Sequence, residues 1–212
     1  MLKELQKAEI LFAIALFAFA VGFPPIEELS EHNLTFHMTV QHILLFLPGL
    51  ILGAQLAKLA APKKTVSILL AIVAVVLMGF WHLPRAWDLA YYHESIHILM
   101  HVSFFIAGVL VSLSLPSLGS LLKWSLLVLL LVFSSILAAN TIGGRQIYQS
   151  STAAQHTQLA IFMIFTMPVM LLAPALTPLY LPGLANFWIH NRLSLYVGSL
   201  LIVALLVGIF VI

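Results

Sequence analysis

Long apolar runs separated by short polar or turn-forming segments make up most of the chain. They predict seven helical spans, at about residues 8–23, 35–57, 65–81, 93–114, 121–139, 152–176 and 192–212. A helix that crosses a membrane needs about 20 apolar residues. No run shows the alternation of a membrane barrel, and lipid offers no partner to an unpaired backbone group. The pattern therefore predicts an all-α polytopic membrane protein in which residues 1–212 form one seven-transmembrane-helix bundle.

Composition supports this prediction and excludes several classes of function. The chain is 62% hydrophobic and 8% charged, whereas soluble domains carry about 25% charged residues. We therefore expect a multi-pass protein of the cell membrane, in contact with lipid. The absence of cysteine excludes disulfides, cysteine-ligated zinc and thiolate catalysis. The net charge of +2 does not indicate nucleic-acid binding. The sequence contains no arrangement of nucleophile, base and acid typical of an enzyme, so we do not predict enzymatic activity.

Basic residues predict the orientation of the bundle. Cytoplasmic loops of membrane proteins are enriched in lysine and arginine. With a cytoplasmic N-terminus, the inner side collects Lys3, Lys7, Lys58, Lys63, Lys64, Lys123 and Arg192. The outer side then holds only Arg85 and Arg145. The bias predicts that the N-terminus is cytoplasmic and that the C-terminus lies outside.

Histidines gather in the outer half of this topology. The eight that do so are His32, His37, His42, His82, His93, His97, His101 and His156, and His190 falls on the cytoplasmic side. Ionisable side chains within membrane spans are costly and usually mark function. The sequence therefore predicts a histidine-lined site just below the outer surface, formed by histidines from four spans.

Spacing selects a pair of ligands on the fourth span. His93, His97 and His101 recur every four residues, so they lie along one stripe of a helix. At about 1.5 Å rise per residue, the first and last of them are roughly 12 Å apart along the axis. One ion cannot bind all three. We expect His97 and His101 to be the binding pair, with His93 at the interface.

The histidines of the second span are not spaced to lie on one face of a helix. At about 100° per residue, His37 and His42 are about 140° apart and do not share a face. We expect His42 to point into the bundle as a ligand, at the depth of His101. His37 and Gln41 then supply a second shell or a neighbouring site.

Two cofactors suit such a cluster. Imidazole binds copper, zinc and iron, and nearby thioethers add a preference for Cu(I). Met38, Met100 and Met163 lie on the histidine-bearing spans. Alternatively, facing histidines could ligate haem b axially, with His42 and His101 as one pair and His37 and His97 as another. Small residues such as Ala107 and Gly108 would then give the porphyrin room.

Aromatic residues cluster between the third and fourth spans. We interpret Trp81, Trp87, Tyr91 and Tyr92 most simply as an interfacial aromatic belt.

Three fragments in order, His37-Met38-x-x-Gln41-His42, Trp81-His82-x-Pro84 and His97-x-x-x-His101, resemble the CtaG-type cytochrome c oxidase assembly factors. These are multi-spanning membrane proteins implicated in delivering copper to a haem–copper oxidase. The likeness covers roughly residues 35–115. It implies copper as the metal, respiratory oxidase subunits as partners, and a functional set made of His37, His42, His82, His97 and His101.

Residues and resemblance together give the expected site. The metal ligands are His37, His42, His82, His97, His101 and His156, and around them we expect Met38, Gln41, Trp81 and Gln155. The leading function is a copper-handling protein that assists assembly of a haem–copper oxidase. The alternative is a membrane b-type cytochrome acting in electron transfer. A di-iron hydroxylase fits less well, because adjacent His-His pairs are absent.

Overall fold

The computed structural model describes residues 2–119 and 147–163, together with residues 122, 125, 132, 136 and 139. Within these ranges the chain is helical and contains no strand. The expected span at 192–212, most of that at 121–139 and the end of that at 152–176 lie outside the described residues. His190, Lys123, Arg145, Arg192 and the C-terminus lie outside them as well.

Short helices and turns connect the long ones. The elements are α1 (Leu2–Gly22), α2 (Pro24–His32), α3 (Leu34–Phe36), the π-helical turn η1 (His37–Gln41), α4 (His42–Leu59), α5 (Lys64–Trp81), α6 (Pro84–Tyr92), α7 (Glu94–Ser114) and the 3-10 turn η2 (Leu115–Ser117). Residues 153–163 form a further helical segment. Pro24 and Pro84 stand at the first turns of α2 and α6, where a missing backbone N–H costs nothing.

The long apolar helices agree with three, or at most four, of the expected spans. Three segments are long and apolar enough to cross a membrane: Leu34–Leu59, Lys64–Trp81 and Glu94–Ser117. A fourth is possible if Lys7–Gly22 and Pro24–His32, which meet at a bend of 54°, count as one broken span. The described residues thus contain three or four candidate spans at the predicted positions.

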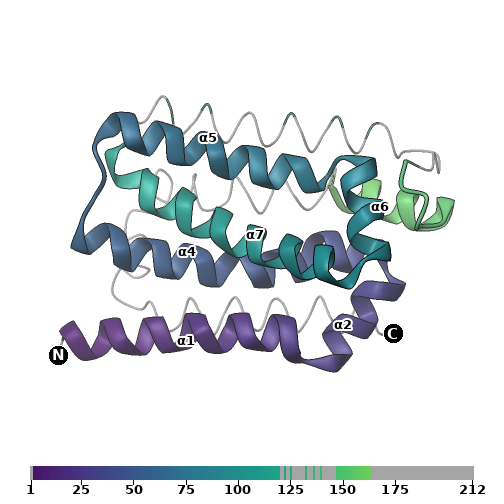
Figure 1. Cartoon of the computed structure of the whole chain (residues 1–212), viewed down its shortest axis with the longest axis horizontal. Helices are drawn as coiled ribbons and strands as arrows, with labels where there is room; N and C mark the ends of the chain where they lie inside the picture. Colours follow the sequence, from purple (N-terminus) through teal and green to yellow (C-terminus); the bar gives the residue numbers. More distant parts are fainter. Residues whose placement is uncertain are drawn as a thin grey trace.

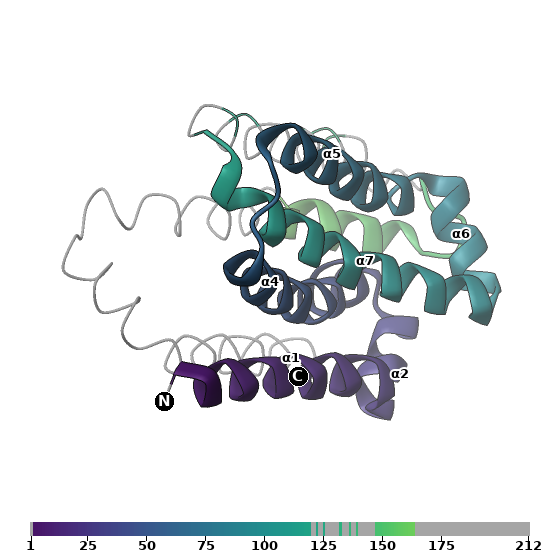
Figure 2. The same cartoon turned by 60° about the vertical axis from the view of Figure 1, so that its left-hand side comes forward.

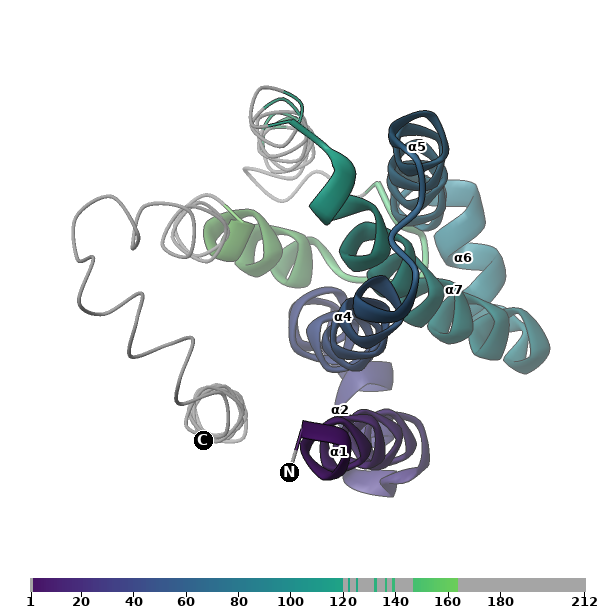
Figure 3. The same cartoon turned by 90° about the vertical axis from the view of Figure 1, so that its left-hand side faces the viewer.

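The four long helices lie side by side along the long axis of the molecule (Figure 1). The end-on view shows α4 and α7 in the middle, α1 against α4 and α5 against α7 (Figure 3). Phe17 of α1 also reaches Phe105 of α7, with ring centroids 4.7 Å apart. The short helices α2 and α6 and the segment 147–163 gather at the end opposite the N-terminus (Figures 1 and 2).

Glycines let α4 and α7 approach until their backbones touch. A Cβ added to Gly49 would lie 2.1 Å from the carbonyl oxygen of Phe105, and one added to Gly108 would lie 2.3 Å from that of Phe46. Small residues at such crossings allow close packing where no hydrophobic driving force acts between helices. This contact fixes the two histidine-bearing helices relative to each other.

Candidate metal centre

A π-helical turn brings His37 and His42 together. The backbone N–H of His42 bonds to the carbonyl oxygen of His37, five residues earlier, so this turn holds one residue more than an α-helical turn. The two ring centroids are 5.3 Å apart. The prediction that the two histidines do not share a face is therefore wrong, because it assumed a rotation of 100° per residue. Such π-turns are frequent at functional sites.

His37 of η1 meets His97 and His101, one turn apart on α7. Ring centroids lie 4.3 Å apart for His97 and His101, 5.1 Å for His37 and His97, and 5.9 Å for His37 and His101. One nitrogen of each ring lies within 4.8 Å of those of the other two. His93 is exposed, as expected. We call these three residues the histidine triad. Its third member is His37, although His42 was expected.

Within the part of the chain that the structure describes, several buried ring nitrogens in the centre lack hydrogen-bond partners. Both nitrogens of His37 and of His42 are in this state. So are the Nε2 atoms of His97 and His101. The Ser30 backbone lies near His37 but outside hydrogen-bonding geometry. Because a buried polar group without a partner costs about 1–3 kcal/mol, this concentration of lone pairs and N–H groups indicates a ligand site.

Glu27 on α2 orients one member of the histidine triad. Its Oε1 lies 3.6 Å from Nδ1 of His97, and its Oε2 accepts a hydrogen bond of 3.1 Å from Nε2 of Gln41. A carboxylate at one nitrogen of a histidine leaves the other nitrogen directed at a metal ion. Gln41 is thus linked to the triad through Glu27. Sequence reasoning missed Glu27, which lies on a different helix and far along the chain from His97.

His42 lies beside the triad, between Phe104 and His82. Its ring stacks on Phe104 with centroids 3.8 Å apart, and the centroid of His82 is 5.7 Å away. Nδ1 of His82 lies 2.6 Å from the carbonyl oxygen of Met78. Burial lowers the pKa of His82 below its ordinary value, although the bond to Met78 opposes that shift. Because a carbonyl oxygen only accepts, Nδ1 of His82 carries the proton of this hydrogen bond.

Aromatic rings enclose the histidines. The Trp87 ring centroid lies 4.7 Å from that of His37 and 6.1 Å from that of His42. Trp87 is 2% exposed and Trp81 is 5% exposed, so the interpretation of these two as an interfacial belt is wrong. Tyr91 and Tyr92 are exposed. Sequence reasoning also missed Phe104, whose proximity to His42 follows from the glycine contact between α4 and α7.

His156 has a structural role in place of the expected ligand role. Its Nε2 accepts hydrogen bonds from the backbone N–H groups of Ile147 and Tyr148, at 3.2 and 3.1 Å. Its Nδ1 donates to the carbonyl oxygen of Thr152 at 2.7 Å. Both nitrogens are therefore occupied. The prediction that His156 binds the metal does not fit this geometry.

Gln155 also serves the local backbone. Its Oε1 accepts from the N–H of Thr152 at 2.8 Å, which closes a capping box at the start of the helical segment. Its Nε2 donates to the carbonyl oxygen of His32 at 2.7 Å. These bonds account for Gln155 without a role at the metal centre.

Residues 147–152 form a loop that packs against α6. The Tyr148 hydroxyl donates to the carbonyl oxygen of His82 at 3.0 Å, and Nε1 of Trp87 donates to Oγ of Ser150 at 3.1 Å. The backbone N–H of Ser150 in turn bonds to Asp88. The loop thus holds the backbone of His82 and the indole of Trp87.

The small residues of α7 leave no space for a porphyrin. Ala107 is fully buried, and the backbone of α4 fills the space beside Gly108. The expectation that these residues make room for a haem is therefore wrong.

A hollow of about 440 Å³ lies at the bend between α1 and α2. It is lined by Val21, Gly22, Pro24, Glu27, Glu28 and Glu31. Glu27 belongs to this hollow and also faces His97. An acidic surface therefore adjoins the histidine triad.

Comparison with known proteins gives one match. A family model described as "Protein of unknown function (DUF1404)" matches residues 11–180. This range is more than half of the chain and includes every histidine except His190. No curated protein and no solved structure matches the chain.

Proposed function

Because the chain belongs to the DUF1404 family, whose function is unknown, we propose a function from its own residues: it binds a copper ion through His37, His97 and His101. The site lies on the outer side of a cell membrane that the chain crosses several times, with its N-terminus in the cytoplasm. The observation that carries the proposal is the meeting of three imidazoles whose ligand atoms lie within 4.8 Å. Four of their six ring nitrogens are buried and have no hydrogen-bond partner among residues 2–119 and 147–163.

The surroundings favour copper in its monovalent state. Three neutral imidazoles bring no charge to balance a metal ion, and the walls are apolar rings such as Phe104 and Trp87. Burying charge in such surroundings is expensive, so a monovalent ion fits better than a divalent one. The carboxylate of Glu27, 3.6 Å from Nδ1 of His97, would balance a single positive charge. Imidazole is also a ligand that copper accepts.

The acidic hollow supports exchange of the ion. Glu27, Glu28 and Glu31 line it, and carboxylates attract cations from solution. An ion collected there has a short path past Glu27 to the triad. The arrangement suits a protein that receives and releases copper.

The recipient that we propose is a haem–copper respiratory oxidase. This step depends on the resemblance to CtaG-type assembly factors, whose fragments in this chain include every member of the triad. Cells that lack the protein should then assemble oxidase deficient in copper, and the wild-type gene but not the His97→Ala variant should restore it. Normal copper content in the oxidase of such cells would refute this client.

Competitive titration of the detergent-purified protein tests copper binding. The probe is Cu(I) held by a coloured chelator under reducing conditions. We expect His97→Ala and His101→Ala each to abolish the tightest binding. His93→Ala, an exposed histidine one turn away on the same stripe, is the matched control and should bind as the wild type does.

Two results would contradict the proposal. One is unchanged affinity in the triad variants. The other is a Soret band that accompanies the purified protein and disappears in the same variants, because that result identifies the alternative b-type cytochrome.

A further inference from the structure

We infer that Trp87 sets the preference of the histidine triad for Cu(I) over Cu(II), because its indole closes the cluster to water on the side of α6. The inference rests on the proposed copper function and deepens it, since it assigns the choice of oxidation state to a residue that is not a ligand. Its basis is the cover that the indole gives to His37, the bonds that hold the indole, and the small number of ligands in the triad.

Trp87 is the aromatic residue of α6 that is turned toward the histidines. Its ring centroid lies 4.7 Å from that of His37 and 6.1 Å from that of His42. It is 2% exposed, whereas Tyr91 and Tyr92 on the same helix are 42% and 63% exposed. His37, which the indole contacts, is itself 3% exposed. The indole therefore covers His37 on the side of α6.

Hydrogen bonds hold the indole in this position. Its Nε1 donates to Oγ of Ser150 at 3.1 Å, and that hydroxyl donates to Oδ1 of Asp88 at 3.0 Å. The carboxylate of Asp88 also accepts bonds of 3.2 Å from the backbone N–H groups of Gln149 and Ser150. The ring of Tyr148 lies 5.4 Å from the indole, centroid to centroid. Because its N–H group is bonded and its ring is packed, the indole is a fixed wall of the cluster.

A wall that excludes water discriminates between the two oxidation states of copper. The triad supplies three imidazole nitrogens, whereas Cu(II) prefers a tetragonal set of nitrogen and oxygen ligands. Water would have to complete that set. The second positive charge of Cu(II) also makes burial among apolar rings more costly. The closed site therefore favours Cu(I).

Removal of the indole would admit water to the cluster. In Trp87→Ala the hydroxyl of Ser150 loses the donor that bonds to it, and His37 loses its cover. Buried water occupies polar spaces in which about 2–4 groups can bond to it. Ser150, its neighbour Asp88 and an ion held by His37 meet that requirement. The acidic hollow is lined by residues of α1 and α2, so this substitution leaves the proposed exchange route intact.

Two dissociation constants, measured on each variant, test the inference. Full-length protein in detergent is titrated with Cu(I) against a coloured chelator under anaerobic, reducing conditions, and with Cu(II) against a second chelator without reductant. We expect the wild type to bind Cu(I) more tightly than Cu(II). In Trp87→Ala the ratio of the two constants should move toward Cu(II) by about tenfold or more, which is typical of groups that surround metal ligands.

Two further variants separate a shield against water from a purely structural role. Trp87→Phe keeps a ring against His37 and loses the bond to Ser150, so the ratio should move in the same direction and by less. Tyr91→Ala removes an exposed aromatic ring from the same helix. It is the matched control and should leave the ratio unchanged. If Trp87→Ala fails to fold, Trp87→Phe decides the matter.

The outcomes separate this inference from the proposed function. If the wild type binds Cu(I) and Trp87→Ala weakens Cu(I) and Cu(II) equally, Trp87 is a packing residue and the inference alone is overturned. An unchanged ratio in both Trp87 variants, or a wild type that binds Cu(II) at least as tightly as Cu(I), would have the same consequence. A wild type that binds no Cu(I) would overturn the proposed function and this inference with it.

Discussion

The same side chain takes opposite roles in this protein according to its hydrogen bonds. His156 is fully buried, and two backbone N–H groups and a carbonyl oxygen occupy its nitrogens. His37 is also buried, at 3% exposed, and its ring nitrogens have no hydrogen-bond partner among the described residues. The first arrangement stabilises a loop, and the second leaves ring nitrogens that could bind a metal ion. Counting histidines along the sequence cannot separate these two cases.

Replacement of Glu27 tests how the triad is oriented. In Glu27→Gln the charge that faces Nδ1 of His97 is lost, so a monovalent ion nearby loses its counter-charge. Loss of such an outer partner typically weakens metal binding about 10–100-fold. Glu28→Gln, in the same hollow, is the control and should change the affinity little. Equal effects of the two substitutions would mean that Glu27 acts only through the charge of the hollow.

At the scale of elements, the sequence predicts helices well and their local geometry poorly. The runs near residues 35–57, 65–81 and 93–114 become helices within a few residues of the expected ends. The π-turn at His37–Gln41 leaves no signal in the hydropathy pattern. It rotates His37 toward α7, which is why His37 completes the triad in place of His42. Glu27 could not be assigned either, because the bend between α1 and α2 sets its position.

The glycine contact between α4 and α7 sets the distance between the two halves of the triad. In Gly49→Ala the new methyl group would lie 2.1 Å from a carbonyl oxygen of α7, so the helices must separate. Overpacking of this kind costs about 1–3 kcal/mol, and copper affinity should fall with it. Gly79→Ala is the control, because none of the described residues lies within 4 Å of its added Cβ. Thermal unfolding and Cu(I) titration would contradict this account if both variants behaved alike.

We expect the free energy of unfolding to fall at alkaline pH because of Tyr148, which lies in the loop that holds His82. Burial raises the pKa of Tyr148 well above its ordinary value, and the Asp88 carboxylate adds to the shift. The folded protein therefore keeps the phenolic proton while the unfolded chain loses it above about pH 10. The contribution of Tyr148 to the free energy of unfolding is therefore fully present below that pH and is lost as the pH rises further.

The Tyr148→Phe variant isolates this effect. It lacks the hydroxyl and its bond to His82, so it should be less stable by about 0.5–1.5 kcal/mol near pH 7. Between about pH 9.5 and 11, unfolding measurements should show the wild type losing stability faster than the variant, because only the wild type has this proton to lose. Parallel curves would show that Tyr148 is not buried as described.

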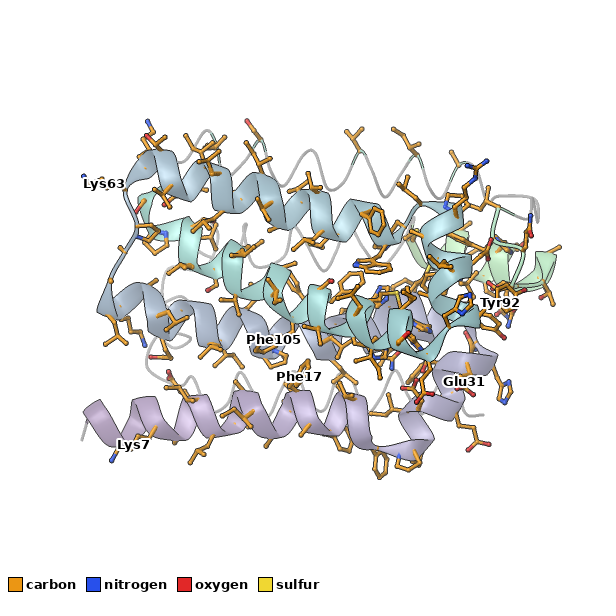
Figure 4. The ribbon with its side chains drawn as sticks, viewed as in Figure 1. Lys7, Phe17, Glu31, Lys63, Tyr92 and Phe105 are labelled. Atoms are coloured by element: carbon orange, nitrogen blue, oxygen red, sulfur yellow. The ribbon has the colours of Figure 1, made fainter. Side chains whose placement is uncertain are left out.

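The whole molecule is asymmetric along its long axis. Lys7 and Lys63 mark one end, and Glu31 and Tyr92 mark the other (Figure 4). The histidine triad lies toward the second end, beside α2 and α6. If the N-terminus is cytoplasmic, as the basic residues predict, this end of the described bundle faces outward.

Cysteine labelling tests this orientation, because the natural chain has no cysteine. Tyr92→Cys, at a position 63% exposed in the wild type, should react with a membrane-impermeant maleimide in intact cells. Lys63→Cys, at the opposite end, should react only after the membrane is opened. The reverse pattern would place the histidine cluster on the cytoplasmic side and contradict delivery to the outer face.

The most direct test of the central claim is the X-ray absorption spectrum of the protein loaded with one equivalent of Cu(I). We predict a first shell of imidazole nitrogens at about 2.0 Å, which changes when His97 is replaced by alanine and not when His93 is. A shell dominated by oxygen or sulfur, or a spectrum that is indifferent to His97, would contradict the claim that His37, His97 and His101 bind the metal.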